Sequence, residues 1–131
     1  MRNYLLLLLL FSTGASAQWQ SLGENEVETA YVDSEDIQRG EHNIVRMWGL
    51  FDLKSPRNIG DMRYLSLKIQ REYACNPKDK RTRVVKRTAH ADHMGNGDLI
   101  YSSNTKEKWA TIKPDSVEEA LWNIACEVTP K

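Results

Sequence analysis

The sequence predicts an α+β domain: a six-stranded antiparallel meander sheet with a C-terminal helix packed on one face and tethered there by a disulfide. Three observations predict this fold. Apolar and polar residues alternate along several short runs that are separated by turn residues. Near the C-terminus the apolar residues recur instead at the spacing of a helix. Two cysteines lie far apart in the chain, one at the end of a predicted strand and one near the end of the predicted helix.

Two strands carry the clearest alternation. In residues 65–75, the apolar side chains and Cys75 share one face, and the polar side chains share the other. In residues 42–53, the apolar side chains again share one face, with Arg46 and Trp48 on the opposite face. We expect four weaker strands, at residues 28–33, 81–91, 99–102 and 106–112.

Turn residues separate these strands. Pro and polar residues mark turns at residues 54–58 and 76–79, and a third turn is expected at residues 95–98. The third turn contains the pair Asn96 and Gly97, which tolerates the positive φ of a tight hairpin.

The last element is an amphipathic helix that begins after Ser116. Apolar residues from Val117 to Val128 recur at helical spacing. Ser116 and Glu119 have the spacing of a capping box, in which each side chain accepts a hydrogen bond from a backbone N–H group at the helix start. One apolar stripe on the helix matches one apolar face on the sheet.

The N-terminal residues 1–17 have the pattern of a secretory signal peptide. A positive residue precedes a short apolar run, and small residues end the segment at Ala17. We therefore expect cleavage between Ala17 and Gln18, leaving residues 18–131 as one exported domain. The apolar run is too short to span a membrane, and no cysteine precedes Cys75. We expect an exported protein, in the periplasm, on the cell surface or secreted, with no membrane anchor and no lipid anchor.

Export bears on the two cysteines. Cys75 and Cys126 would reach an oxidising compartment, and their spacing is not that of a redox or zinc motif. They are expected to form a structural disulfide.

Charge narrows the classes of partner. The chain carries 18 Lys and Arg residues and 18 Asp and Glu residues, so overall charge attracts neither nucleic acid nor an anionic membrane. The most basic stretch is residues 78–87. On a regular strand, Arg81, Arg83 and Arg87 would share one face, and Lys86 would lie on the other. The stretch is either a charged strand protected from edge pairing or a surface for an acidic partner.

Trp48 and Arg46 form a second candidate contact, since an aromatic side chain beside an arginine is typical of interface anchors. Together the two features give six candidate partner-binding residues: Arg46, Trp48, Arg81, Arg83, Lys86 and Arg87.

Catalytic and metal-binding patterns are weak. Ser103 and Lys106 match a bare S-x-x-K string without its supporting motifs. His90 and His93, with His42 far away, do not have zinc-ligand spacing. We expect no enzyme, no cofactor and no bound metal.

Several short motifs, in order and with the two-cysteine frame, resemble the surface-adhesin protein E family of Gram-negative bacteria. They are Tyr31-Val32-Asp33, Arg46-Met47-Trp48, Ser66-Leu67-Lys68, Glu72-Tyr73-Ala74-Cys75, Met94-Gly95-Asn96-Gly97, Trp109, Pro114-Asp115-Ser116 and Ala125-Cys126. The resemblance implies an antiparallel sheet with a C-terminal helix tethered by the disulfide. It also implies binding of host matrix or serum proteins such as laminin and vitronectin.

The combined expectation is a non-enzymatic exported binding module for a protein partner, adhesin-like in character. The alternative is a periplasmic structural or envelope-maintenance protein of unknown partner, which the lack of a lipidation cysteine favours. An open sheet edge would allow a dimer.

Overall fold

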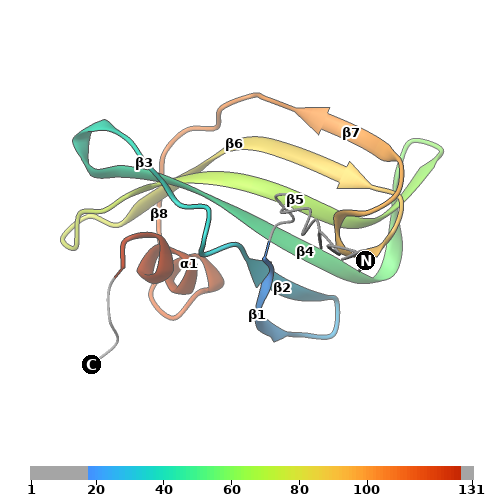
Figure 1. Cartoon of the computed structure of the whole chain (residues 1–131), viewed down its shortest axis with the longest axis horizontal. Helices are drawn as coiled ribbons and strands as arrows, with labels where there is room; N and C mark the ends of the chain where they lie inside the picture. The colour runs from blue at the N-terminus through green and yellow to red at the C-terminus, as the bar shows by residue number, and fades with distance from the viewer. Residues whose placement is uncertain (1–17, 128–131) are drawn as a thin grey trace, which may run out of the picture.

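Two long strands, β4 (Ile44–Ile59) and β5 (Met62–Ala74), form the centre of the computed structural model, which describes residues 18–127 (Figure 1). The predicted signal peptide, including Ala17, lies outside the described residues, as does Val128. The other elements are β1 (Gln20–Glu24), β2 (Glu28–Val32), β3 (Gln38–Arg39), η1 (Glu41–Asn43), β6 (Arg81–His90), η2 (His93–Gly95), β7 (Leu99–Ser103), β8 (Ala110–Thr111) and α1 (Val117–Ala125).

The sheet is an antiparallel meander. Its main path has the order β1-β2-β4-β5-β6-β7, so each strand lies beside its neighbours on this path. The two-residue strands β3 and β8 extend it, β3 beside β4 and β8 beside β6. The predicted six-stranded meander with one helix on one face is confirmed for the described part of the chain.

The six strands of the main path are not all the predicted ones, and two segments differ from the prediction. β1 was not expected, because its sequence contains a single apolar side chain, Leu22, and gives no alternation. The strand expected at residues 106–112 is too long, since only Ala110 and Thr111 of this range form a strand, β8, which pairs with β6. The residues before them form a loop along β6, where the Glu107 N–H donates to the Val84 carbonyl over 2.9 Å.

The turn predicted at residues 54–58 is also wrong. β4 continues through this segment with a register shift against β5 between Asp52 and Arg57. An irregular, exposed stretch of strand tolerates Pro56 because no ladder hydrogen bond depends on its missing N–H. The chain turns later, between Ile59 and Met62, where Gly60 supplies a φ of +60°.

The larger core lies between α1 and the sheet. Helix side chains pack on side chains of β2, β4 and β5: Leu121, Trp122 and Ala125 against Val32, Val45, Met47 and Tyr73. A nine-residue helix is marginal by itself, and a fully buried Leu-sized side chain contributes about 1.5–3 kcal/mol. Tertiary packing therefore holds the helix in place. A second cluster forms around Leu53, Tyr64 and Ala89.

Ser116 caps α1 as predicted. Its Oγ accepts a hydrogen bond from the Glu119 N–H over 3.1 Å. The Glu119 carboxylate accepts from the Asp115 N–H over 3.2 Å, one residue earlier than in the expected capping box. The start of the helix is thus fixed by two side chains.

The predicted disulfide joins the end of β5 to the end of α1. Cys75 and Cys126 are bonded across a sequence separation of 51 residues. Beside them, the Trp122 Nε1–H donates to the Ala74 carbonyl over 2.7 Å. The helix end is therefore tied to the sheet by a covalent bond and a hydrogen bond.

Candidate functional site

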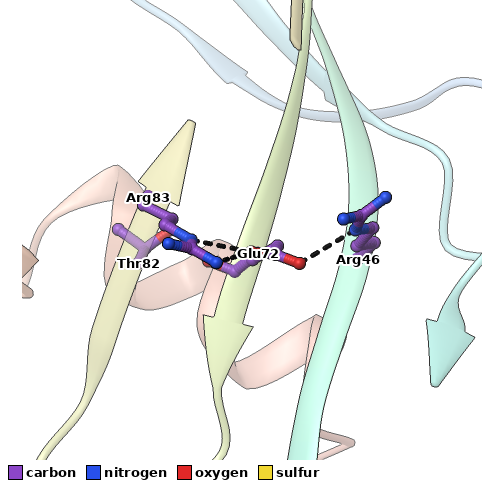
Figure 2. A network of polar contacts seen from close by, with 4 residues as sticks. All are labelled: Arg46, Glu72, Thr82 and Arg83. Carbon is purple, nitrogen blue, oxygen red and sulfur yellow. Dashed lines mark hydrogen bonds and ion pairs between the residues drawn. The ribbon is translucent and has the colours of Figure 1, made fainter. Parts of the chain in front are cut away.

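The face of the sheet opposite α1, here called the open face, brings together cations from three strands. Arg46 of β4 pairs in register with Glu72 of β5, and Glu72 pairs with Arg83 of β6. Because side chains alternate along a strand, these three residues point to the same side, away from the face that packs on α1. They form one row across β4, β5 and β6, close to the C-terminal end of β5 (Figure 2).

Glu72 lies between the two arginines and holds both. The Arg46 Nε–H donates to Glu72 Oε2 over 2.9 Å, and the Arg83 Nε–H donates to Glu72 Oε1 over 2.7 Å. The Glu72 side chain is only 8% exposed. Burial raises the pKa of this carboxyl, but the hydrogen bonds and charges of Arg46 and Arg83 together outweigh burial, so its pKa lies below the usual value. The row therefore carries one negative and two positive charges.

A β-bulge places Lys86 on the open face as well. Arg71 pairs with Val84 and Gln70 pairs with Lys86, so Val85 is an extra residue in β6. The extra residue reverses the alternation after it. The predicted division of faces is therefore wrong: Arg81, Arg83 and Lys86 share the open face, and Arg87 lies on the other face, paired with Glu107.

Two tryptophans lie beside these cations. The Lys86 Nζ lies 6.0 Å from the centre of the Trp48 ring, and the Arg83 guanidinium lies 4.5 Å from the Trp109 ring. Such contacts are favourable because the ring face is electronegative. They also restrict the long side chains. Trp48 is on the face that the sequence predicts.

Arg81, the first residue of β6, also lies on the open face, where it pairs with Ala74 at the end of β5. Its Nε lies 3.0 Å from the Asp79 carboxylate in the turn that precedes β6, and its side chain is about half exposed. We call Arg46, Trp48, Arg81, Arg83 and Lys86 the basic patch. It contains five of the six residues proposed from the sequence and excludes Arg87.

The loop between β6 and β7 covers the other end of the open face. The Met94 N–H donates to Asp52 Oδ1 and the Gly95 N–H to Ser66 Oγ, each over 2.8 Å. The Ser66 hydroxyl in turn donates to the Asp92 carbonyl over 2.7 Å. This loop packs on the row of Asp52 and Ser66, which lies further along the β4–β5 ladder than the row of Arg46 and Glu72. The loop therefore does not cover the row of Arg46 and Arg83.

The histidines have separate partners. His90 Nε2 lies 2.8 Å from Thr88 Oγ1, and His93 Nδ1 lies 3.1 Å from Asp52 Oδ1. His42 lies exposed in η1. Within residues 18–127, no three side chains of the His, Cys, Asp and Glu types are grouped to hold a metal ion.

Two residues of this site, Glu72 and Trp109, carry no signal in the sequence that marks them as part of it. Glu72 belongs to the polar side of the alternating strand 65–75, but alternation does not reveal which residues lie opposite it on the neighbouring strands. Trp109 comes from the loop that replaces the expected strand 106–112. No local signal marks either one as a partner of Arg83.

The family model for surface-adhesin protein E matches the chain over residues 19–127. The chain belongs to the surface-adhesin protein E family. The resemblance inferred from the sequence motifs is thereby confirmed. Membership makes the chain an adhesin-like surface protein, in a family named for adhesion.

Solved structures of Haemophilus influenzae protein E have the same fold. One superposes with a TM-score of 0.67 at 17% sequence identity, covering 86% of each chain. A structure of protein E from non-typeable Haemophilus influenzae superposes with a TM-score of 0.57 at 21% identity, covering 84% of this chain and 74% of that one. No curated protein matches the chain in sequence.

Surface proteins of this family must leave the cytoplasm. Among the described residues, no helix is both long enough and apolar enough to span a membrane.

Proposed function

We propose that the protein is a non-enzymatic binding module whose basic patch holds an acidic segment of another protein. The observation that carries this proposal is the row Arg46–Glu72–Arg83, in which one buried carboxylate serves two guanidiniums. One positive charge remains in excess in that row. Lys86 adds a second, since it forms no ion pair with any of residues 18–127.

Preorganisation makes this patch more than a charged strand. Arg46 and Arg83 are fixed through Glu72, and Arg83 is also fixed through Trp109. Ordering a long flexible side chain on binding costs free energy, and here much of that ordering exists before a partner arrives. Arg46 uses only its Nε toward Glu72, so its terminal N–H groups point elsewhere (Figure 2). They are available to a partner carboxylate.

Membership of the family supports a choice of partner class. The resemblance implies host matrix or serum proteins, and laminin and vitronectin are the first probes. An acidic stretch on such a protein would meet Arg46, Arg83 and Lys86, while Trp48 would supply an apolar anchor at the side of the patch.

The decisive experiment compares two adjacent residues of one strand. Lys86 and Arg87 are consecutive residues of β6 after the bulge, and consecutive side chains of a strand point to opposite faces of the sheet. We expect Lys86→Glu to weaken binding to immobilised laminin or vitronectin about tenfold, and Arg87→Glu to change it less than about twofold. Binding is measured by surface plasmon resonance at two salt concentrations, and the wild-type affinity should fall as salt rises.

Equal effects of the two variants would contradict the assignment of the basic patch, because a face-specific site must distinguish them. Binding that is insensitive to salt would contradict its electrostatic basis. Both variants should keep the far-ultraviolet circular dichroism spectrum of the wild type.

We also propose that residues 1–17 are a signal peptide, that residues 18–131 form the exported domain, and that the protein is displayed at the cell surface. The pattern ending at Ala17 supports the first point. Sequencing of the mature N-terminus should give Gln18. Protease added to intact cells should cleave the protein while a periplasmic marker survives. Cleavage only after lysis would instead place the partner in the periplasm.

A further inference from the structure

A cleft lies on the face that α1 covers, between the β1–β2 hairpin and the first turns of the helix. Its volume is about 370 Å³. In Figure 1 the hairpin, which forms one edge of the sheet, and α1 both lie below β4. The nine residues of α1 span only about 13 Å, so the helix does not reach across this face. The cleft is separate from the basic patch, which faces the other way.

The floor of the cleft is apolar. Ala30 and Phe51 are paired residues of β2 and β4 that face the cleft, and Leu22 of β1 lies beside them. Val117 and Ala120 close the helix side. Val117 is 48% exposed and is one of the large apolar side chains that folding leaves at the surface. Folding therefore leaves apolar surface here that a further group can cover.

The rim of the cleft is acidic. Glu24 and Glu28 come from the hairpin and Glu118 comes from α1, and no Lys, Arg or His residue of the described chain lines the cleft. Glu24 and Glu118 each have one basic neighbour outside the lining, at 3.0 Å and 4.0 Å. Glu28 forms no ion pair with any of residues 18–127. The rim thus presents carboxylate oxygens next to an apolar floor.

We infer that this cleft binds a short segment of a partner protein in which an apolar side chain is flanked by Lys or Arg. The apolar side chain enters the cleft, and the flanking cations pair with the glutamates of the rim. A neutral apolar ligand would bury the Glu28 carboxylate, which has no ion-pair partner among residues 18–127, and this costs free energy. A flanking cation offsets that cost.

The size of the cleft sets the size of the occupant. Its volume lies near the lower limit of known ligand sites, about 300 Å³, so it holds one or two side chains. A stable dimer buries about 800 Å² on each partner, and a cleft of this volume offers far less apolar surface. A peptide segment therefore fits better than a second copy of this chain.

The test is a titration of the isotope-labelled protein with the peptide acetyl-Lys-Leu-Lys-Phe-Lys-amide, followed by NMR chemical shifts. We expect shifts at the amides of Glu28, Ala30, Phe51 and Ala120. Two control peptides, one with Glu in place of Lys and one with Ser in place of Leu and Phe, should give no shifts at these positions. Shifts of equal size with the Ser peptide would overturn the role of the apolar floor.

Matched variants locate the site. Glu28→Lys should weaken the peptide at least about fivefold, whereas Glu26→Lys, in the same hairpin but outside the cleft, should change its affinity less than about twofold. Glu118→Gln on α1 serves as a second variant should Glu28→Lys disturb the hairpin. Equal weakening by Glu28→Lys and Glu26→Lys would mean unspecific attraction and would overturn the inference. If the chemical shifts at the cleft changed with protein concentration in the absence of peptide, the cleft would bind a second copy of this chain. That result would also overturn the inference.

Discussion

Replacing Glu72 by Gln tests the central row of the site directly, because it removes the charge and keeps the size of the side chain. The Glu72 side chain is 8% exposed, and those of Arg83 and Arg46 are 23% and 38% exposed. Removing one partner of a fully buried ion pair costs about 3–5 kcal/mol. The arginines here reach water in part, which reduces their penalty, so we expect a loss of about 2–3 kcal/mol in the free energy of unfolding.

The assay is urea unfolding at pH 7, with Glu107→Gln as the control. Glu107 pairs with Arg87, and both side chains of that pair are 43% exposed. Loss of such a surface pair costs less than about 1 kcal/mol. If Glu72→Gln were within about 0.5 kcal/mol of the wild type, or no worse than the control, the argument that Glu72 holds two partly buried arginines would be refuted.

The pH dependence supplies an internal check on the same pair of proteins. The pKa of Glu72 is lower in the folded protein than its usual value of 4.5. Its stabilising contribution is therefore fully present above the unfolded pKa and is lost as the pH falls through the folded pKa. The difference in stability between wild type and Glu72→Gln should be constant above about pH 5.5 and shrink below about pH 4.5. A difference that persisted unchanged to pH 2 would have a cause other than the charge.

Three further predictions concern the frame that carries the site. Replacing Cys75 and Cys126 by Ser opens a loop of about 50 residues and should lower the free energy of unfolding by about 4 kcal/mol, measured by urea unfolding; a loss below about 1 kcal/mol would argue against the covalent clamp. Ser116→Ala removes the cap of α1 and should cost about 1 kcal/mol, whereas Ser116→Asp should restore most of it. Gly60→Ala should cost about 1 kcal/mol from the positive φ alone, since nothing lies within 4 Å of the added methyl group. Gly60→Asn should cost less, because Asn adopts a positive φ more readily than Ala. The stabilities of the Ser116 and Gly60 variants are measured by thermal melts.

Local pattern predicted the strands that carry regular alternation and the helix that carries a cap. β4 and β5 alternate over the residues that flank Arg46 and Glu72, so the faces of these residues follow from the sequence. The helix start follows from Ser116, because its side chain satisfies a backbone group that the first turn leaves unpaired. Each of these features is decided within a few residues of chain.

Features decided between distant segments were not predictable from one sequence. The bulge at Val85 depends on how β6 pairs with β5. This one extra residue places Lys86 on the same face as Arg83, and it places Arg87 on the opposite face. The partners of Glu72 depend on the register of two hairpins. Proline at position 56 indicated a turn, yet the long β4–β5 hairpin tolerates it as an exposed irregularity.

The position of Glu72 explains how a sheet can collect cations without losing stability. Arg46 and Arg83 lie in one row on the two strands that flank β5, where like charges repel unless a counter-charge separates them. A single carboxylate on the middle strand separates the two and is itself kept ionised by both. If the row held a single arginine beside Glu72, it would be neutral and would attract no acidic partner. Without Glu72, the two arginines would turn toward water and lose their fixed geometry. The same residue therefore supports the fold and leaves the excess charge on which the proposed binding depends.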